Sequence, residues 1–445
     1  MNVPPHAERQ RSHGRVASSD DRRRVTPVAL TRKLTRGPLD QDGVDSAVDD
    51  PLAPSTSIHT SPPRSRALSP AQLPQNAAVS NTPDVPPKDF SFLQDPAAYH
   101  VLPPAAVPLA FQSAAYVPSL SSPIASLLQT GHYRLAAIAA ARNLVAAASP
   151  TDYDTLFHLL HIRLACLCLI QEQALASQEA KVLGDLSSAF YRHALTNAHL
   201  VPWALRLLVV RLAALGYGEW RKGIMGYYEL ARECRETLLK PTTSEAEKPL
   251  WRTRLRDCGI RVANVLVEMG DLEGAGRHLG TLSSSDDAPD STEAREVLLM
   301  ETLVWLRLGD IPTARSRLSR ASAHAAPSLV DATLTALILL AESEYEAACT
   351  SFQALHAEHP ADAMITQNLA VCLLYTGRIA EARTVLEDLV HASPPFYSSV
   401  FNLSTVFELC TEKNRDRKVG VAEMLAERKE GGGVGWEVGN VVFKL

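Results

Sequence analysis

Hydrophobic and polar residues follow a helical period over most of the chain after residue 123. Apolar residues recur at positions i, i+3, i+4 and i+7 in the ranges 123–148, 153–173, 174–195, 202–215, 219–239 and 251–424. This spacing is typical of amphipathic α-helices, whereas half-buried strands alternate apolar and polar residues. The sequence shows no sustained alternation, so the pattern predicts an all-α fold.

The first quarter of the chain has a different composition. Nineteen of the 29 prolines precede residue 125, and residues 1–89 are rich in proline, serine, arginine and aspartate without a helical period. Such a segment buries too little apolar surface to offset the entropy of ordering it, so we expect a disordered tail. Its basic start suits a solvated tail, a nuclear-import signal or a contact with anionic lipid. Aromatic residues return in 90–122, which we expect to be an extended proline-rich segment laid against the folded part.

A repeat of 34 residues organises the C-terminal half. Its clearest part is a short turn between two helices, which occurs at 269–272, 308–311, 342–345 and 376–379. The turn residues Gly309, Ser343 and Gly377 follow one another at intervals of 34 residues. Gly270 and Gly309 lie 39 residues apart, and the acidic stretch 283–291 accounts for the excess.

Residues at fixed distances from each turn share a chemical character. Five positions after the turn residue stands a small residue, and nine positions after it a large apolar one: Ala275, Ala314, Ala348 and Ala382, then Leu279, Leu318, Phe352 and Leu386. Glycine at the turn adopts the left-handed conformation that ends a helix, alanine lets two helices approach closely, and the large residue fills the space between repeats. Pro360 and Pro394 close the last two units, since proline cannot continue a helix.

This combination predicts tetratricopeptide repeats, and therefore an α-solenoid. We assign the repeats to 251–427, divergent helical hairpins to 123–250 and a tail to 428–445. Within 123–250 the turn at 130–133 with Ala136 matches only in part, so a generic helical bundle is the alternative there. A solenoid leaves a long surface free, which is typical of proteins that bind other proteins.

Charge and composition disfavour several other classes. The formal net charge is -5 and no basic face with interleaved aromatics is found, which disfavours nucleic acid as a partner. The longest uncharged apolar run, 333–341, is shorter than the roughly 20 residues of a membrane span, and the N-terminus lacks the apolar core of a secretory signal. The arginine-rich start is compatible with a transit peptide, although early acidic residues argue against it. Seven scattered cysteines without CxxC pairs indicate a reduced, intracellular protein, and the missing span and secretory signal lead us to expect a soluble one.

The sequence offers no catalytic apparatus. His158 and His161, like His356 and His359, are three residues apart on helices but lack a third ligand nearby, so we expect no metal site. The glycine run 431–435 lacks the preceding strand and the Gly-Lys-Ser/Thr ending of a phosphate loop. No nucleophile elbow, HExxH motif or convincing carboxylate pair is present. We therefore expect a protein that is not an enzyme, with no catalytic residue and no cofactor.

Several motifs are more specific than the repeat. They are NLAVCLLYTGR at 368–378, SVFNLSTVFEL at 399–409, LVPWALRL at 200–207, LWRTRL at 250–255 and the closing VFKL at 442–445. Over about residues 120–445 they resemble the subunit 12 family of the trafficking protein particle (TRAPP) complex, which has similar C-terminal repeats, a Val-Pro-Phe motif, a Leu-Trp-Arg-Ser-Arg-Leu motif and a similar closing segment. The chain departs from that family in its short 216–250 region and in the glycine run.

The resemblance implies a peripheral subunit of a multisubunit tether and guanine nucleotide exchange assembly that acts between endoplasmic reticulum and Golgi. In that family the exchange activity belongs to the small core subunits. The implied partners are other TRAPP subunits. The implied location is the cytoplasm, with membrane association only through the complex.

The inner face of the repeats is where we expect partner contacts. First helices turn one face inward along a solenoid, which places Gln367, Val371, Tyr375 and Asn402 there, and packing within the array is their alternative role. A rival function is a co-chaperone adaptor that captures acidic C-terminal peptides. That mode needs lysine, arginine and asparagine on the inner face, whereas the corresponding positions here are mostly threonine, leucine, glutamine and valine.

Overall fold

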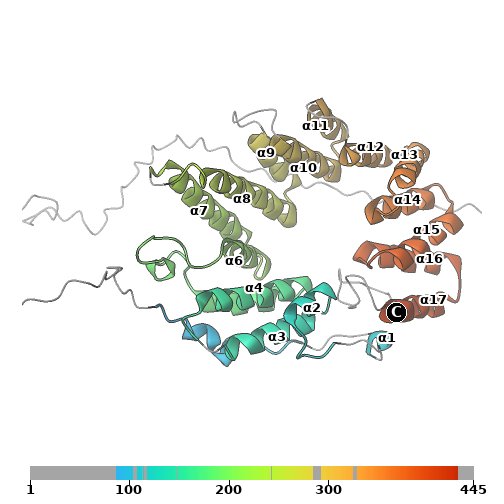
Figure 1. Cartoon of the computed structure of the whole chain (residues 1–445). Helices are drawn as coiled ribbons and strands as arrows, with labels where there is room; N and C mark the ends of the chain where they lie inside the picture. Colours follow the sequence, from blue (N-terminus) through green and yellow to red (C-terminus); the bar gives the residue numbers. More distant parts are fainter. Residues whose placement is uncertain are drawn as a thin grey trace, which may run out of the picture. The chain divides into compact units, whose positions relative to one another are not determined.

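The computed structural model describes residues 87–103, 108–112, 114, 118–147, 149–241, 243–283, 292–323 and 328–428. The α-helices in these residues (Figure 1) are α1 Leu109–Gln112, α2 Ile124–Gln129, α3 Tyr133–Val145, α4 Tyr153–Leu169, α5 Gln173–Ala180, α6 Trp203–Leu215, α7 Trp220–Leu239, α8 Lys248–Met269, α9 Leu272–Ser283, α10 Thr292–Leu308, α11 Ile311–Ala323, α12 Leu329–Ala341, α13 Tyr345–Glu358, α14 Ala363–Tyr375, α15 Ile379–Ala392, α16 Tyr397–Cys410 and α17 Asn414–Ala426. One isolated antiparallel bridge joins Arg192 and His199. The predicted all-α fold is confirmed.

Some predictions concern residues that the structure does not describe. The tail before residue 87, the acidic stretch 284–291 and the end of the chain from 429, with its glycine run and closing motif, lie outside the described residues.

Short turns join the two helices of each unit from α8 onward. The turn residues Gly270, Gly309, Ser343 and Gly377 have φ angles of 91°, 89°, 67° and 78°. This left-handed conformation ends the first helix and lets the second turn back along it. The small and large residues that follow each turn are buried, from Ala275 and Leu279 in the first unit to Ala382 and Leu386 in the fourth.

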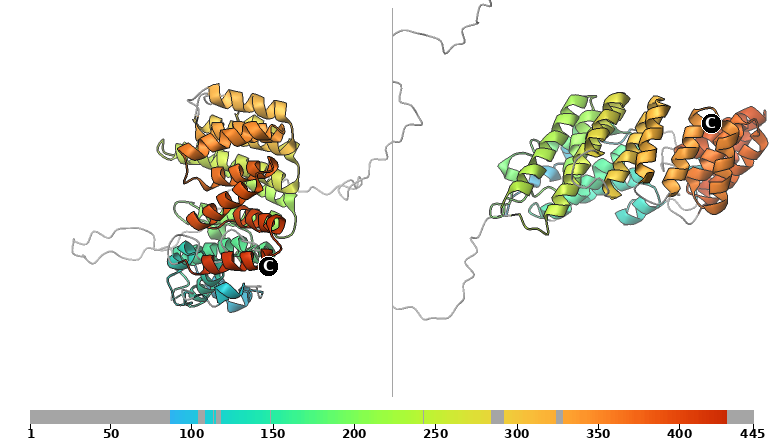
Figure 2. Two further views of the ribbon diagram at one scale, coloured as in Figure 1. Left: turned by 90° about the vertical axis from the view of Figure 1, so that its right-hand side faces the viewer. Right: turned by 90° about the horizontal axis from the view of Figure 1, so that it is seen from above.

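Each helix packs mainly against its neighbours in the chain. The closest associations include α7 with α8, α9 with α10, and α14 with α15, and the views of Figure 2 show these helices lying side by side. The buried apolar residues accordingly form several local clusters, such as one built by α12 to α15 and another by α14 to α17. Stability in such a fold is a sum of neighbouring interfaces.

The segment before the helices is anchored to them by aromatic residues. Phe90 and Leu93 are fully buried in the apolar cluster of α4 to α6, and the Phe90 ring lies 5.1 Å from that of Phe157. Farther along, α1 packs against α17, and Phe111 joins the apolar cluster of α14 to α17. This segment, which contains the 3-10 helices Ser91–Gln94 and Pro96–Ala98 as well as α1, thus completes the core at two places.

A buried ion pair fixes the first hairpins. The Arg163 guanidinium on α4 donates to both carboxylate oxygens of Glu179 on α5, at 2.9 and 2.6 Å. It also donates to the carbonyls of Ala137 at 3.2 Å and His100 at 2.9 Å. The His100 N–H donates in turn to Glu179 at 2.9 Å. Two side chains therefore join α3, α4, α5 and the N-terminal segment.

The helix predicted for 174–195 is wrong beyond Ala180. There α5 gives way to a 3-10 turn, and Gly184 follows with φ 60°, which a helix cannot accommodate. Ser188 then caps a second 3-10 turn, and Tyr191 is buried against α4. In this loop Leu183 and Tyr191 are buried, whereas Phe190 and Leu195 are exposed. The partial repeat turn expected at 130–133 is present, because Gly131 has φ 74° between the end of α2 and the start of α3.

Candidate protein-binding surface

The four residues expected on the inner face differ in exposure. Tyr375 is 62% exposed, and its ring stacks on Tyr345 with centroids 4.9 Å apart. Val371 and Asn402 are half-buried. Gln367 is only 5% exposed, and its side-chain amide donates to the Ser398 carbonyl at 3.4 Å, between α14 and α16. Tyr375 therefore offers a partner the largest surface of the four.

Two sequence motifs separated by about fifty residues meet in space. Trp203, in LVPWALRL, begins α6, and Trp251, in LWRTRL, lies in the first turn of α8. Their rings are 6.3 Å apart and nearly perpendicular, at 81°. The Arg254 guanidinium lies over both rings, at 5.0 and 4.6 Å, and Arg206 lies over Trp203 at 5.3 Å. Cation–π contacts of this kind contribute about 0.5–2 kcal/mol each.

Glu233 of α7 completes this tryptophan–arginine cluster by pairing with arginines outside α7. Glu233 accepts from Arg206 at 2.5 Å and lies 3.5 Å from Arg192. Burial raises the pKa of Glu233, but the hydrogen bond and charge of Arg206 outweigh it, so the net pKa is lowered. Burial also lowers the pKa of Arg254. The cluster ties α6 and α8 to the helix between them.

The sequence analysis identified both tryptophan motifs but did not predict that they contact each other. A usable signal was present, because each tryptophan is followed three residues later by an arginine, as in Trp203 with Arg206 and Trp251 with Arg254. That spacing puts both side chains on one helix face. The signal does not say which two helices meet, since no local pattern encodes that contact.

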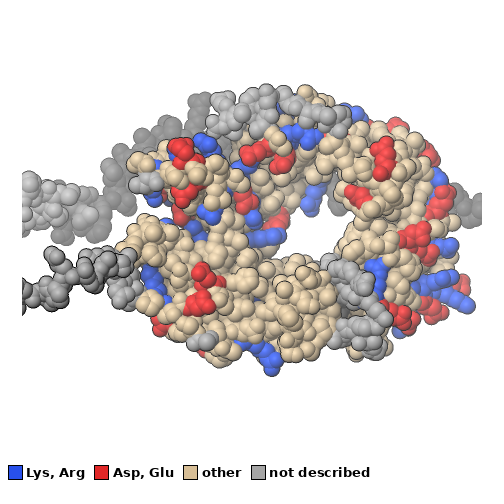
Figure 3. All heavy atoms as spheres, in the orientation of Figure 1, with Lys and Arg blue, Asp and Glu red and all other residues tan. Residues whose placement is uncertain are grey.

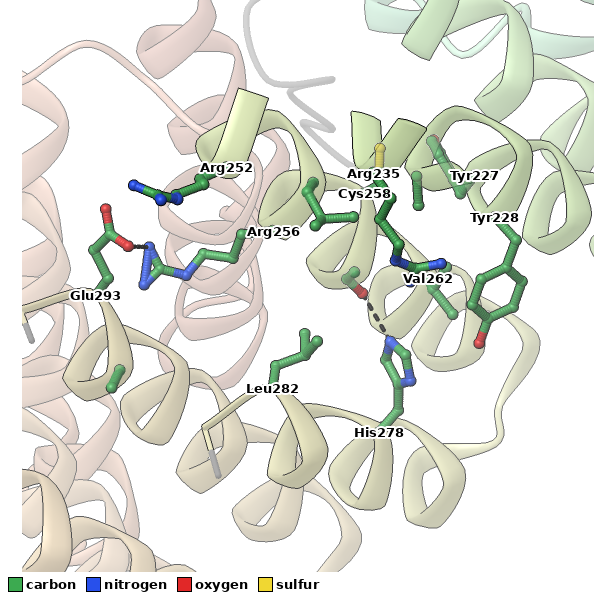
Figure 4. A pocket seen from close by; sticks show the side chains of 14 residues that line it. Tyr227, Tyr228, Arg235, Arg252, Arg256, Cys258, Val262, His278, Leu282 and Glu293 are labelled. Carbon is green, nitrogen blue, oxygen red and sulfur yellow. Dashed lines mark hydrogen bonds and ion pairs between the residues drawn. The ribbon is translucent and has the colours of Figure 1, made fainter. Parts of the chain in front are cut away.

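A pocket lies beside the cluster and is lined by the same α8 motif. It has a volume of about 380 Å³ and lies among α7, α8, α9 and the start of α10 (Figure 4). Ala231, Cys258 and Val262 form its buried apolar floor, together with the half-buried Leu255 and Leu282. We call it the α8 pocket. Its volume falls in the range of ligand-binding pockets.

Arginines surround the α8 pocket. Arg256 pairs with Glu293, while Arg235 and Arg252 are exposed and form no hydrogen bond or ion pair with the described residues. Figure 4 shows Arg252 and Arg256 on one side, and Arg235 on the other side near His278. The pocket therefore combines an apolar floor with a positive rim in a chain whose net charge is -5.

A second, more polar pocket of about 300 Å³ lies among α6, α7, α8 and α10. Three arginines line it: Arg211, Arg261 and Arg307. Glu268 pairs with Arg211 at 2.9 Å, and Asp257 pairs with Arg261 at 2.9 Å. Because two of its three cations are already paired within the chain, this pocket has less unpaired charge to offer than the α8 pocket.

Elsewhere charges of both signs are mixed. On the face shown in Figure 3, acidic and basic side chains are interspersed over α13 to α17, while uncharged side chains predominate over α2 to α4. A surface of this kind suits protein contacts rather than a polyanion.

The part of the chain that the structure describes contains no cluster of residues that could form a metal site. No three histidine, cysteine or acidic residues there lie close enough to hold an ion. Burial, and then the charge of His158, lowers the pKa of His161. His356 instead shares a hydrogen bond with Thr366 at 3.1 Å. In the same residues, no helix has the length and apolar character to cross a bilayer.

The fold defines an α-solenoid with tetratricopeptide repeats. The family model for the tetratricopeptide repeat matches residues 339–403, which span the end of α12, α13 to α15 and the first half of α16. Among solved structures, a tetratricopeptide repeat protein from Parabacteroides merdae is similar, with a TM-score of 0.36 and 15% identity, over 60% of this chain and 98% of that one.

Two curated proteins are similar to the chain in sequence. Trafficking protein particle complex subunit 12 of Mus musculus is 23% identical over 313 residues, which are 63% of this chain and 38% of that protein. Its Homo sapiens counterpart is 24% identical over 304 residues, or 61% of this chain and 40% of that protein. The chain thus aligns with about two-fifths of the length of these relatives.

Proposed function

We propose that the chain is a non-catalytic scaffold subunit of a TRAPP-type tethering assembly in traffic between endoplasmic reticulum and Golgi. It binds partner subunits through its helical repeats and associates with membranes only through them. Exchange activity in such an assembly resides in other subunits.

One observation carries this proposal. The chain is similar to subunit 12 of the trafficking protein particle complex over more than 300 residues. Two motifs of that resemblance, far apart in the sequence, form a single cluster of Trp203, Trp251 and Arg254.

Affinity purification of the full chain from its own cells, followed by mass spectrometry, tests the proposal. We expect other TRAPP-type subunits to copurify in fixed stoichiometry. A Trp251→Ala variant should lose partners that contact α6 to α8, while Arg415→Glu, an exposed change on α17, should keep them. Recovery of chaperones alone would contradict the proposal.

The rival adaptor function has little support from the site. The inner-face cation that it would use, Arg378, donates to Glu381 at 2.8 Å. A carboxylate already held by the chain competes with a peptide carboxylate for that guanidinium.

A further inference from the structure

The α8 pocket has a composition that points to one kind of occupant. Its floor is apolar and includes the fully buried Cys258. At its mouth, the Tyr228 ring is 41% exposed. An exposed aromatic ring beside an apolar floor is where interface anchor residues are usually seated.

Positively charged side chains stand on both sides of the α8 pocket, where they would flank an anchor residue of a partner. Arg235 projects from α7 on one side, and Arg252 and Arg256 project from α8 on the other (Figure 4). Of these three, only Arg256 forms an ion pair with a described residue, Glu293. His278 donates to the Gly259 carbonyl at 3.0 Å and so is engaged within the wall. The lining thus keeps two positive charges in excess, which a carboxylate ligand would neutralise.

We propose that the α8 pocket binds an acidic segment of a partner protein. A phenylalanine or leucine of that segment is seated over Leu255 beside Tyr228, and flanking aspartates or glutamates pair with Arg235 and Arg252. This inference deepens the proposed function, on which it rests, because it gives the chemistry of a partner that the scaffold takes up.

Fluorescence anisotropy with the full chain tests the chemistry directly. The probe is a fluorescein-labelled peptide with a central phenylalanine and aspartates on both sides. Matched peptides carry asparagine for aspartate, or alanine for phenylalanine. We expect each change to weaken binding about tenfold or more, and the affinity for the acidic probe to fall as salt is added.

Variants locate the binding. Arg235→Glu combined with Arg252→Glu should weaken binding of the acidic probe at least about tenfold. Both side chains are exposed, so the fold is expected to persist, which a thermal melt checks. The control is Arg232→Glu, the same arginine-to-glutamate reversal at one exposed arginine of α7 outside the pocket lining, which should bind within about twofold of the unaltered chain.

Three results would overturn the inference: equal binding of the asparagine peptide, equal losses in the double variant and the Arg232 control, or binding that requires Asp286, Asp287 and Asp290 to be changed to asparagine. The last would identify the chain's own acidic connection as the occupant. Loss of peptide binding with copurification of TRAPP-type subunits intact refutes only the pocket assignment. Peptide binding without such copurification refutes only the proposed function.

Discussion

Replacement of Glu179 by alanine is expected to destabilise the first hairpins strongly. Arg163 and Glu179 are each 1% exposed, and their two hydrogen bonds are 2.9 and 2.6 Å long. Without the carboxylate, a guanidinium stays buried and unpaired, which costs about 3–5 kcal/mol. The His100 N–H loses its acceptor as well, so the N-terminal segment should loosen together with α4 and α5.

Hydrogen–deuterium exchange resolves this effect along the chain. A loss of about 3–5 kcal/mol corresponds to exchange roughly a hundredfold to several thousandfold faster in α3 to α5, where opening controls exchange. Peptides from α14 to α16 act as the internal control, because stability in a repeat fold depends on neighbouring units. Their exchange should change little.

A double variant distinguishes the cost of leaving one charge buried without a partner from the loss of the attraction between the two charges. Arg163→Met combined with Glu179→Leu removes both charges and keeps apolar volume, so it should recover most of the stability lost in Glu179→Ala. The reasoning is refuted if Glu179→Ala changes exchange in α3 to α5 by less than about tenfold, or if the double variant is as unstable as the single one.

Three further predictions concern the repeats. A Cβ at Gly276 would lie 2.7 Å from the Trp305 ring, so Gly276→Val should lower the free energy of unfolding by about 1–3 kcal/mol; an unchanged thermal melt would contradict this. Ser343 has φ 67°, so Ser343→Gly should raise the free energy of unfolding by about 1 kcal/mol in urea titrations, and a decrease would refute the argument. Burial, and then Cys349, raises the pKa of Cys372 from 9.0 to about 11. The neutral thiol is thus favoured in the folded state, and its contribution, complete below pH 9, is lost as pH rises through about 11. Cys372→Ala should flatten that loss in urea titrations at stepped pH, and an unchanged slope would count against it.

The sequence determined the helical units because their signals are local. A turn residue, a small residue five positions later and a large one nine positions later lie within one helix pair, so spacing alone places them, as at Gly377, Ala382 and Leu386. The same locality explains the failure at 174–195. Leu183 and Tyr191 are buried there in the cluster of α4 to α6, and periodicity does not distinguish a loop with a few buried apolar side chains from a helix.

Tertiary structure decided which distant residues meet. Arg163 and Glu179 became a buried pair only because α3, α4, α5 and the N-terminal segment close around them. Trp203 and Trp251 are about fifty residues apart in the sequence but 6.3 Å apart in the fold. The α8 pocket likewise takes its lining from four helices. Spacing within one helix fixes which side chains share a face, but the packing of whole helices fixes what that face meets.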